Sequence, residues 1–269
     1  MDIKARLIAP IAILDMLMHF TDASGPSIKA AIHAYPFETG TVLAATDGHS
    51  MAIYQDPTHL HSEGLPCSWI IQQPMVLARA SMKGYAKTRM HGFLDLVATE
   101  GSATGNLRVT PSKMAEDIRS MPECGPTCHV LGSVNTEFDC AAGIRRVLGP
   151  ALSDTFYPLQ NPINVELFAQ IQKGLKAAGQ KTSPILIGSG SEDGGGPHIW
   201  RLDGSLSDFP GSSLYGLIMP MRRTSADKDY PLANRLRPDW LAEFGQVSRL
   251  PAPEIEKPAD EAPTRRRAA

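Results

Sequence analysis

The sequence predicts an α+β protein in which sheets contribute more than helices. Short apolar segments typical of strands are separated by a few longer segments with helical periodicity. A strand–helix–strands order recurs about twice in each half of the chain, without repeats strong enough to align. The 269 residues are 42% apolar and 20% charged, which is typical of a globular protein with a sizeable core.

In the first half, residues 3–8 predict a strand, and residues 10–20 predict a helix whose first turn contains Pro10. Strands are expected at 28–35, within 41–54 after a turn signal at 38–40, and at 68–71. A second helix is expected from Pro74 to about Gly84. Residues 93–98 and 106–110 are expected to pair as a hairpin around residues 101–105.

In the second half, the pattern predicts a strand at 129–134 and a helix at 137–148. A longer helix is expected at 165–178, because its apolar residues fall on one stripe (Leu167, Phe168, Ile171 and Leu175). Strands at 184–187, 198–202 and 214–219 follow.

Residues 224–269 differ in composition from the rest of the chain. They hold eight basic residues, eight acidic residues and six prolines. Large apolar side chains are nearly absent after Leu250, so we expect disorder from about that residue onward. Residues 238–250 carry enough apolar side chains for a short amphipathic helix.

Several protein classes are disfavoured by simple features. Lys4 and Arg6 precede an apolar stretch that faintly resembles a secretory leader, but Pro10 and Asp15 interrupt it, so the cytoplasm is the expected location. No apolar run approaches the ~20 residues of a membrane span, and no membrane partner is expected. Four unevenly spaced cysteines do not predict a disulfide framework.

The string Gly48-His49-Ser50-Met51-Ala52 has two readings from local chemistry. It approaches the G-x-S-x-G nucleophile elbow, which would make Ser50 the nucleophile of a serine hydrolase. However, an elbow needs a strand-to-helix turn, and the following residues continue a strand. Asp47-Gly48 is a common two-residue turn signal, so a β-hairpin is the alternative.

Two strings resemble one protein family. Residues 43–52, Leu-Ala-Ala-Thr-Asp-Gly-His-Ser-Met-Ala, closely resemble the A-T-D-G-H-R-L-A segment of the bacterial DNA polymerase III beta subunit, the replicative sliding clamp. Residues 217–222, Leu-Ile-Met-Pro-Met-Arg, resemble the V-V-M-P-M-R stretch that ends beta-clamp chains. The resemblance extends over about residues 1–112 and 155–223.

The resemblance implies a sliding-clamp fold, in which domains of antiparallel sheets carry paired helices. The family has three such domains, and this chain has room for two: residues 1–122, similar to the second, and residues 123–223, a shortened third. It implies a processivity factor, with no catalytic site and no cofactor, that encircles double-stranded DNA without reading its sequence. Expected partners are a DNA polymerase, a clamp loader and further copies of the chain, in a trimer rather than a dimer. A clamp-fold module that does not close a ring is the alternative.

The family binds client peptides in a surface pocket, and its positions are matched here by residues of both strings. They are Thr46, Gly48, His49, Met51, Leu217, Met219, Pro220, Met221 and Arg222. Methionine, leucine and proline suit adaptable apolar recognition. Ser50 stands where the family usually has arginine, and 46 residues follow Arg223, whereas the family chain ends near this point.

Basic residues are separated from acidic ones, although the net charge is −2. No carboxylate occurs at 64–94 or at 140–153, and basic residues also recur on the helix expected at 165–178. Phosphate binding needs such segregation, whereas a solvated helix face is the alternative. The expected DNA-binding residues are Arg79, Lys83, Lys87, Arg89, Arg145, Arg146, Lys173 and Lys176.

Two further clusters give weak signals. Cys124, Cys128, His129 and Cys140 could ligate zinc, but C-x3-C without a second pair favours buried thiols, so no metal is expected. The glycine-rich residues 188–196 lack the G-K-[ST] ending of a phosphate loop, and Glu192 and Asp193 would repel a phosphate. A hairpin loop is the expected structure there.

Overall fold

The computed structural model describes residues 2–26, 28–37, 40–56, 61–71, 79–111, 123, 128–134, 142–143, 146, 163–181, 184–189, 196–202 and 212–221. Met1–Arg222 form one compact unit, and residues 223–269 lie outside the described residues. The expected disorder after about residue 250 and the expected helices at 238–250 and, for most of its length, 137–148 fall outside them as well. The domain boundary at residue 122 stays a prediction.

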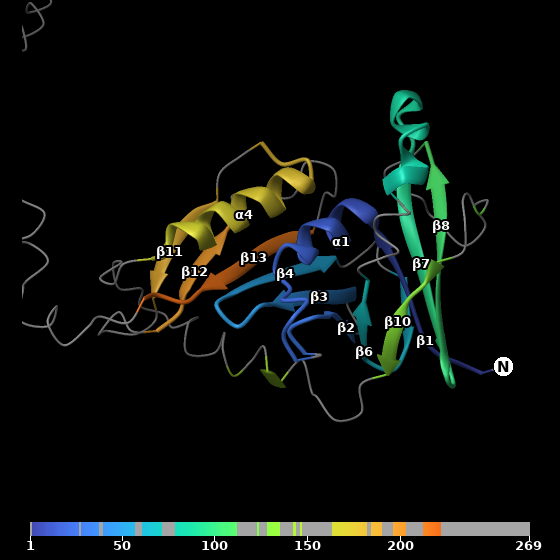
Figure 1. Ribbon diagram of the computed structural model, residues 1–269, viewed down its shortest axis with the longest axis horizontal. Helices are drawn as coiled ribbons and strands as arrows, with labels where there is room; N and C mark the ends of the chain where they lie inside the picture. Colours follow the sequence, from blue (N-terminus) through green and yellow to red (C-terminus); the bar gives the residue numbers. More distant parts are fainter. Residues whose placement is uncertain are drawn as a thin grey trace, which may run out of the picture. The chain divides into compact units, whose positions relative to one another are not determined.

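One antiparallel sheet has five strands in the order β5-β1-β7-β8-β9. Their bounds are β5 His61–Gly64, β1 Ile3–Pro10, β7 His91–Thr99, β8 Ser102–Thr110 and β9 Cys128–His129. Figure 1 shows β1, β7 and β8 as long neighbouring strands. This arrangement confirms the expected first strand and the expected pairing of β7 with β8.

The second antiparallel sheet has eight strands in the order β10-β6-β2-β3-β4-β13-β12-β11. Their bounds are β10 Leu131–Val134, β6 Cys67–Ile70, β2 Ile32–Phe37, β3 Gly40–Thr46, β4 Ser50–Asp56, β13 Ser213–Ile218, β12 His198–Arg201 and β11 Ile185–Ser189. Strands from the two ends of the compact unit therefore meet in one sheet, at β4 and β13. Two antiparallel sheets with few helices confirm the predicted α+β class.

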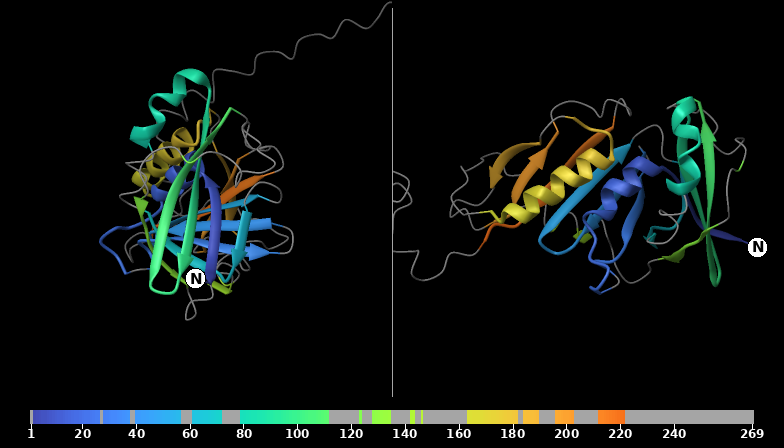
Figure 2. Two further views of the ribbon diagram at one scale, coloured as in Figure 1. Left: turned by 90° about the vertical axis from the view of Figure 1, so that its right-hand side faces the viewer. Right: turned by 45° about the horizontal axis from the view of Figure 1, so that its top comes forward.

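Helices α1 (Ile11–Met18) and α4 (Val165–Ala177) pack against each other beside this sheet (Figure 1; Figure 2, right). Pro10 is the N-cap of α1 rather than a residue of its first turn. The side chain of Asn164 caps α4 by accepting from the Glu166 amide at 2.9 Å. Gly179, with φ +76°, ends α4 in a left-handed conformation, as glycine commonly does. No described helix is long and apolar enough to cross a membrane.

Gly174 allows the two helices to approach closely. A Cβ at this position would lie 2.9 Å from Cε2 of Phe20 and 3.3 Å from the carbonyl oxygen of Met16. Phe20, which follows α1, stacks on the Trp200 ring of β12 with 5.9 Å between centroids and 19° between planes. The helix pair is thereby joined to the eight-stranded sheet through aromatic contact.

The alternation of side chains along β3, β4 and β13 gives the eight-stranded sheet two apolar faces. One face belongs to the main core, which includes both helices and residues of both sheets. The other face holds a smaller buried cluster of Val42, Ala44, Ile53, Ile199 and Leu217, against which Met51 and Tyr215 pack. Met51 and Leu217, two residues of the expected client site, belong to this second face.

The hairpin of β7 and β8 differs from the expectation. Thr99 pairs with Ser102, so the turn contains only Glu100 and Gly101, and the loop expected at 101–105 is wrong. Gly105 lies within β8, where a Cβ would approach Val130 Cγ2 to 2.9 Å. This glycine makes room for packing and does not make a turn.

A buried ion network crosses the five-stranded sheet at Asp95, which is 1% exposed. Arg6 of β1 donates to both carboxylate oxygens at 3.0 and 2.8 Å, and Nε of Arg108 on β8 donates to Oδ2 at 2.8 Å. Burial alone would raise the pKa of Asp95, but the two guanidinium groups outweigh this effect and hold the pKa below its usual value. The network stabilises the charged carboxylate at neutral pH.

Candidate functional site

The first motif forms the turn between β3 and β4. Thr46 pairs with Met51, so residues 47–50 make the reversal, and the two-residue turn expected at Asp47-Gly48 is too short. Oδ1 of Asp47 accepts from the amides of His49 and Ser50 at 2.7 Å each. Thr46 Oγ1 donates to the Ser50 carbonyl oxygen at 2.8 Å. The motif therefore holds its own backbone through its Thr and Asp side chains.

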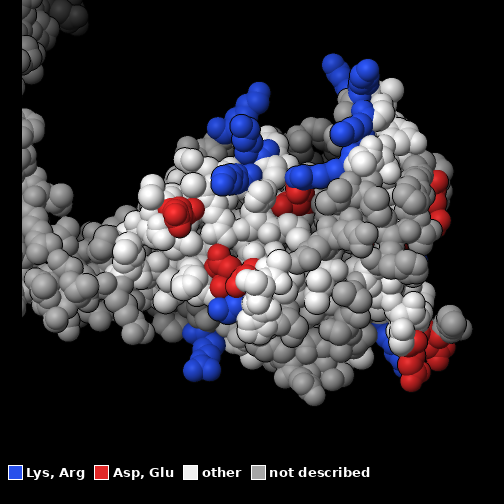
Figure 3. Space-filling model, viewed as in Figure 1, with Lys and Arg blue, Asp and Glu red and all other residues white. Residues whose placement is uncertain are grey.

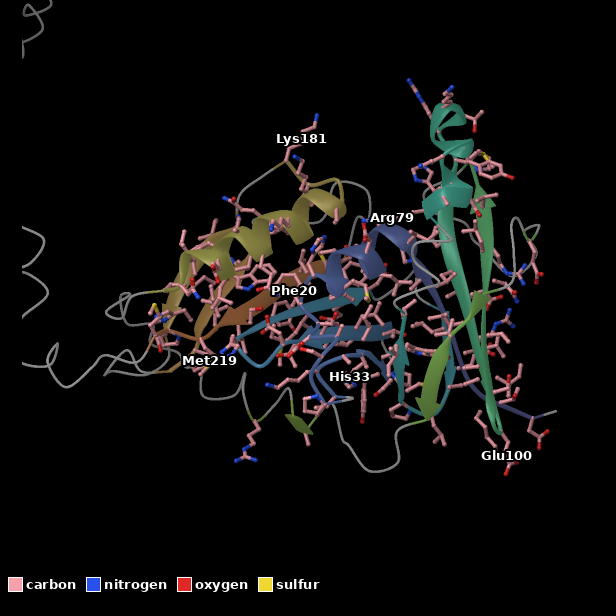
Figure 4. All side chains as sticks on the ribbon, viewed as in Figure 1. Phe20, His33, Arg79, Glu100, Lys181 and Met219 are labelled. Atoms are coloured by element: carbon pink, nitrogen blue, oxygen red, sulfur yellow. The ribbon has the colours of Figure 1, made fainter. Side chains whose placement is uncertain are left out.

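The second motif lies directly beside this turn. Met51 pairs with Leu217 and Ser50 with Ile218 in the antiparallel ladder of β4 and β13. Beyond the end of β13, the Met219 amide donates to the His49 carbonyl oxygen at 2.8 Å. Two motifs that are far apart in the sequence thus share one backbone ladder. Figure 4 labels Met219 at this end of the sheet.

We call the accessible residues of this region the motif surface: Thr46, Gly48, His49, Met51, Met219, Pro220 and Met221. Met219 and Met221 are 39% and 51% exposed, which is unusual for large apolar side chains. Gly48 and His49 are exposed, and the other three are half-buried. Leu217 is only 2% exposed and supports the surface from the smaller cluster, so it is not positioned to contact a ligand. Arg222 lies outside the described residues.

Ser50 does not occupy a nucleophile elbow. It begins strand β4 and no helix follows it, so the strand-to-helix turn that exposes a nucleophile is missing at this position. The residue is 3% exposed, and its hydroxyl lies 3.2 Å from Asp47 Oδ2 and 3.3 Å from Gln170 Oε1. These contacts give Ser50 a structural role and overturn the serine hydrolase alternative.

The expected DNA-binding residues that the structure describes are exposed side chains, and most of them belong to α4 or to residues 79–89. Figure 3 shows Lys and Arg gathered over α4 and over the segment around η1 (Tyr85–Thr88). Lys87 lies on η1, and Arg89 follows this element with a φ of +56°. Those described in the structure are Arg79, Lys83, Lys87, Arg89, Arg146, Lys173 and Lys176, and all of them are exposed. Arg145 lies outside the described residues.

Arg79 differs from the other basic residues because it forms an ion pair with Asp15 of α1. The Asp15 side chain is 13% exposed, so the guanidinium compensates a nearly buried carboxylate. Arg79 and Lys181 are labelled on the same side of the molecule in Figure 4. The positive charge of Arg79 is therefore partly compensated within the protein, which leaves less of it for a phosphate.

His19 lies where α1 approaches α4. Burial lowers its pKa, and the nearby ammonium group of Lys173 lowers it further. The imidazole is consequently neutral at physiological pH, and Lys173 supplies the positive charge at this point of the helix pair.

Gln170 of α4 is a site residue that the sequence pattern did not reveal. Its Nε2 donates to the carbonyl oxygen of His19 at 2.5 Å and to Oδ2 of Asp47 at 2.8 Å. A polar residue on an amphipathic helix gives no signal of a contact with a turn more than 100 residues away. Only the packed structure brings the two together.

The described residues contain no group of three or more His, Cys, Asp or Glu side chains that could hold a metal ion. Cys124 and Cys140, two of the four weak zinc candidates, lie outside the described part of the chain, as do residues 190–195 of the glycine-rich segment.

No protein-family model and no curated protein sequence matches the chain. Among solved structures it is similar to DNA polymerase III subunit beta from Borrelia burgdorferi in complex with a natural product, with a TM-score of 0.49 and 12% identity over 83% of this chain and 64% of that chain. It is also similar to the sliding clamp of Bartonella birtlesii bound to griselimycin (TM-score 0.44, 14% identity, 83% and 68% covered). A third match is the sliding clamp of Bacillus subtilis (TM-score 0.49, 6% identity, 88% and 68% covered). The matched region spans 64–68% of the length of these clamp chains.

Proposed function

We propose that the chain is a clamp-like, non-catalytic accessory protein of DNA synthesis that encircles duplex DNA and tethers a polymerase or another client. The observation that carries the proposal is the meeting of the two motifs, where the Met219 amide binds the His49 carbonyl oxygen at 2.8 Å. Both halves of the family's client site are thereby assembled on one surface. Because the solved clamps share only 6–14% sequence identity with this chain, the proposal rests on these residues.

The motif surface has the chemistry of a peptide-binding site. Met219 and Met221 expose flexible thioether side chains that adapt to apolar partners, and Pro220 between them restricts the backbone. The turn beneath is held by four hydrogen bonds of Thr46 and Asp47 with neighbouring backbone groups. A preorganised backbone with adaptable side chains lowers the ordering cost of binding a short segment.

The basic edge supports the DNA-binding part of the proposal. Lys173 and Lys176 on α4, and Lys83, Lys87 and Arg89 around η1, are exposed, and Figure 3 shows Lys and Arg gathered over these two segments, which we call the basic edge. Contacts of this kind are made to phosphates, are independent of sequence and weaken with salt. Sequence-independent contact is what a protein needs in order to move along a duplex.

The remaining features of the proposal follow the family. We propose two domains, residues 1–122 and 123–223, which the pairing of β4 with β13 joins within one compact unit. We also propose a closed homotrimer that acts in the cytoplasm with a clamp loader. Among the described strands, β11 forms an edge of the eight-stranded sheet, and Ile185 on it is 43% exposed. An edge strand of a sheet can pair with a strand of another subunit. Light scattering should give the mass of three chains, whereas a monomer at micromolar concentration would exclude the closed ring.

Griselimycin provides a probe for the motif surface, because the Bartonella birtlesii clamp was solved with it bound. We expect the wild-type chain to bind griselimycin in isothermal titration calorimetry. Replacing both Met219 and Met221 with glutamate should weaken binding by at least about 100-fold, since two apolar contacts of ~1.5 kcal/mol each are lost. Leu65→Glu, at an apolar residue 54% exposed elsewhere, is the control and should leave binding unchanged. Wild-type protein that does not bind, or a double variant that binds equally well, would contradict the proposed site.

A further inference from the structure

Gln170 is the point at which the helix pair is connected to the motif surface. Its two amide protons are both used, one on the His19 carbonyl oxygen at the end of α1 and one on the Asp47 carboxylate in the turn. Its Oε1 lies 3.3 Å from the Ser50 hydroxyl oxygen. The orientation of the amide is determined by chemistry, because the carbonyl and carboxylate oxygens can only accept hydrogen bonds.

A continuous series of hydrogen bonds leads from Gln170 to the second motif. Gln170 binds Oδ2 of Asp47, whose Oδ1 accepts from the amides of His49 and Ser50 at 2.7 Å. The His49 carbonyl oxygen then accepts from the Met219 amide at 2.8 Å. The position of Asp47 thus determines where His49 lies, and His49 in turn holds the start of the Met219–Met221 segment.

We infer that Gln170 is a positioning residue of the motif surface, which fixes Asp47 and through it the backbone that presents His49 and Met219. Asp47 is only half-buried and is otherwise bonded to its own turn, so without Gln170 nothing among the described contacts fixes that turn to α4. The expected effect of Gln170 on ligand binding rests on the proposed function. Its expected effect on the order of the turn between β3 and β4 does not.

The decisive variant is Gln170→Glu. It removes the donor and places a carboxylate beside the Asp47 carboxylate, so the turn should be released from α4. Gln172→Glu is a matched control, since it makes the same charge change at an exposed position of the same helix. The pair Asp47→Asn with Gln170→Glu restores a donor–acceptor contact with the turn in the opposite direction, and the oxygen of the new amide can still accept from the His49 and Ser50 amides. It does not restore the hydrogen bond to the His19 carbonyl oxygen, so the rescue is partial.

Amide hydrogen exchange of His49 and Ser50, measured in the full chain, tests the positioning directly. We expect Gln170→Glu to speed their exchange by about tenfold or more, the loss of one hydrogen bond to a charged group, while amides of β7 keep their rates. Griselimycin binding should weaken by a similar factor. Gln172→Glu should change neither the exchange nor the binding, and the Asp47→Asn, Gln170→Glu pair should recover part of the protection at His49.

Unchanged exchange at His49 and Ser50 in Gln170→Glu would overturn the inference. Uniformly faster exchange across β7 as well would indicate a general stabilising role and would also overturn it. If the wild type fails to bind griselimycin but the turn responds to Gln170→Glu, the proposed client site fails and the positioning role stands. If the wild type binds and Gln170→Glu leaves binding unaffected, the positioning role fails and the client site stands.

Discussion

Replacing Lys173 and Lys176 with alanine tests whether α4 faces the phosphate backbone. Both side chains are exposed, and no ion pair among the described residues involves either of them. Each phosphate contact contributes about 0.9 to the slope of log Kd against log salt concentration, so the loss of two contacts lowers the slope by about 1.8. Extrapolated from a common value near 1 M salt, this corresponds to about 60-fold weaker binding at about 0.1 M.

The assay is fluorescence anisotropy of a labelled primed DNA hairpin, titrated with protein at a series of salt concentrations. Lys4→Ala is the control, because Lys4 is exposed on β1, away from the basic edge. It should leave the slope unchanged. If the double variant has the wild-type slope, or if Lys4→Ala lowers the slope as much, α4 does not bind phosphates and the argument from charge segregation is wrong.

Three further substitutions test the fold around the site. Gly216→Ala should lower the free energy of unfolding by about 3 kcal/mol or more in urea titrations, because the added Cβ would lie 2.4 Å from Cζ2 of Trp200; an unchanged midpoint would refute the close packing. Asp95→Asn should cost about 3 kcal/mol at pH 7 and progressively less as the pH is lowered below ~4. The folded pKa of Asp95 is below its usual value, so its stabilisation is present above pH ~4 and is lost as the pH falls through the folded pKa; a cost that does not decrease at acid pH would contradict this reasoning. Arg79→Ala should lower the free energy of unfolding by about 1 kcal/mol in the same urea titrations, because Asp15 loses its partner. An unchanged free energy of unfolding would show that the ion pair does not contribute to stability.

The strands and α4 could be predicted because their signals are local. The apolar stripe of α4, its Asn164 cap and the glycine after its last turn are consecutive in the sequence, and the predicted bounds differ from the structure by one residue. The close approach of the two motifs could be expected only from the family resemblance. No local signal places β13 beside β4.

Three residues have roles that depend on contacts between distant segments. The glycine pattern predicts a turn that includes Gly105, but this residue lies in a strand where the Val130 side chain needs the space. The family resemblance places Leu217 on a binding surface, but the second apolar face of the sheet buries it. The hydrogen bond from Gln170 to Asp47 depends on tertiary packing and leaves no periodic pattern in the sequence. Contacts between distant segments determine all three roles.

Retention on circular DNA tests the central claim most directly. The protein is incubated with nicked circular DNA long enough for rings to open and close, and is then passed through a gel-filtration column at about 0.5 M salt, where phosphate contacts alone are weak. A closed ring predicts that the protein elutes with the circular DNA and is released when the same DNA is linearised before the column. Equal loss from circular and linear DNA would contradict encirclement and would favour a clamp-fold module that does not close a ring.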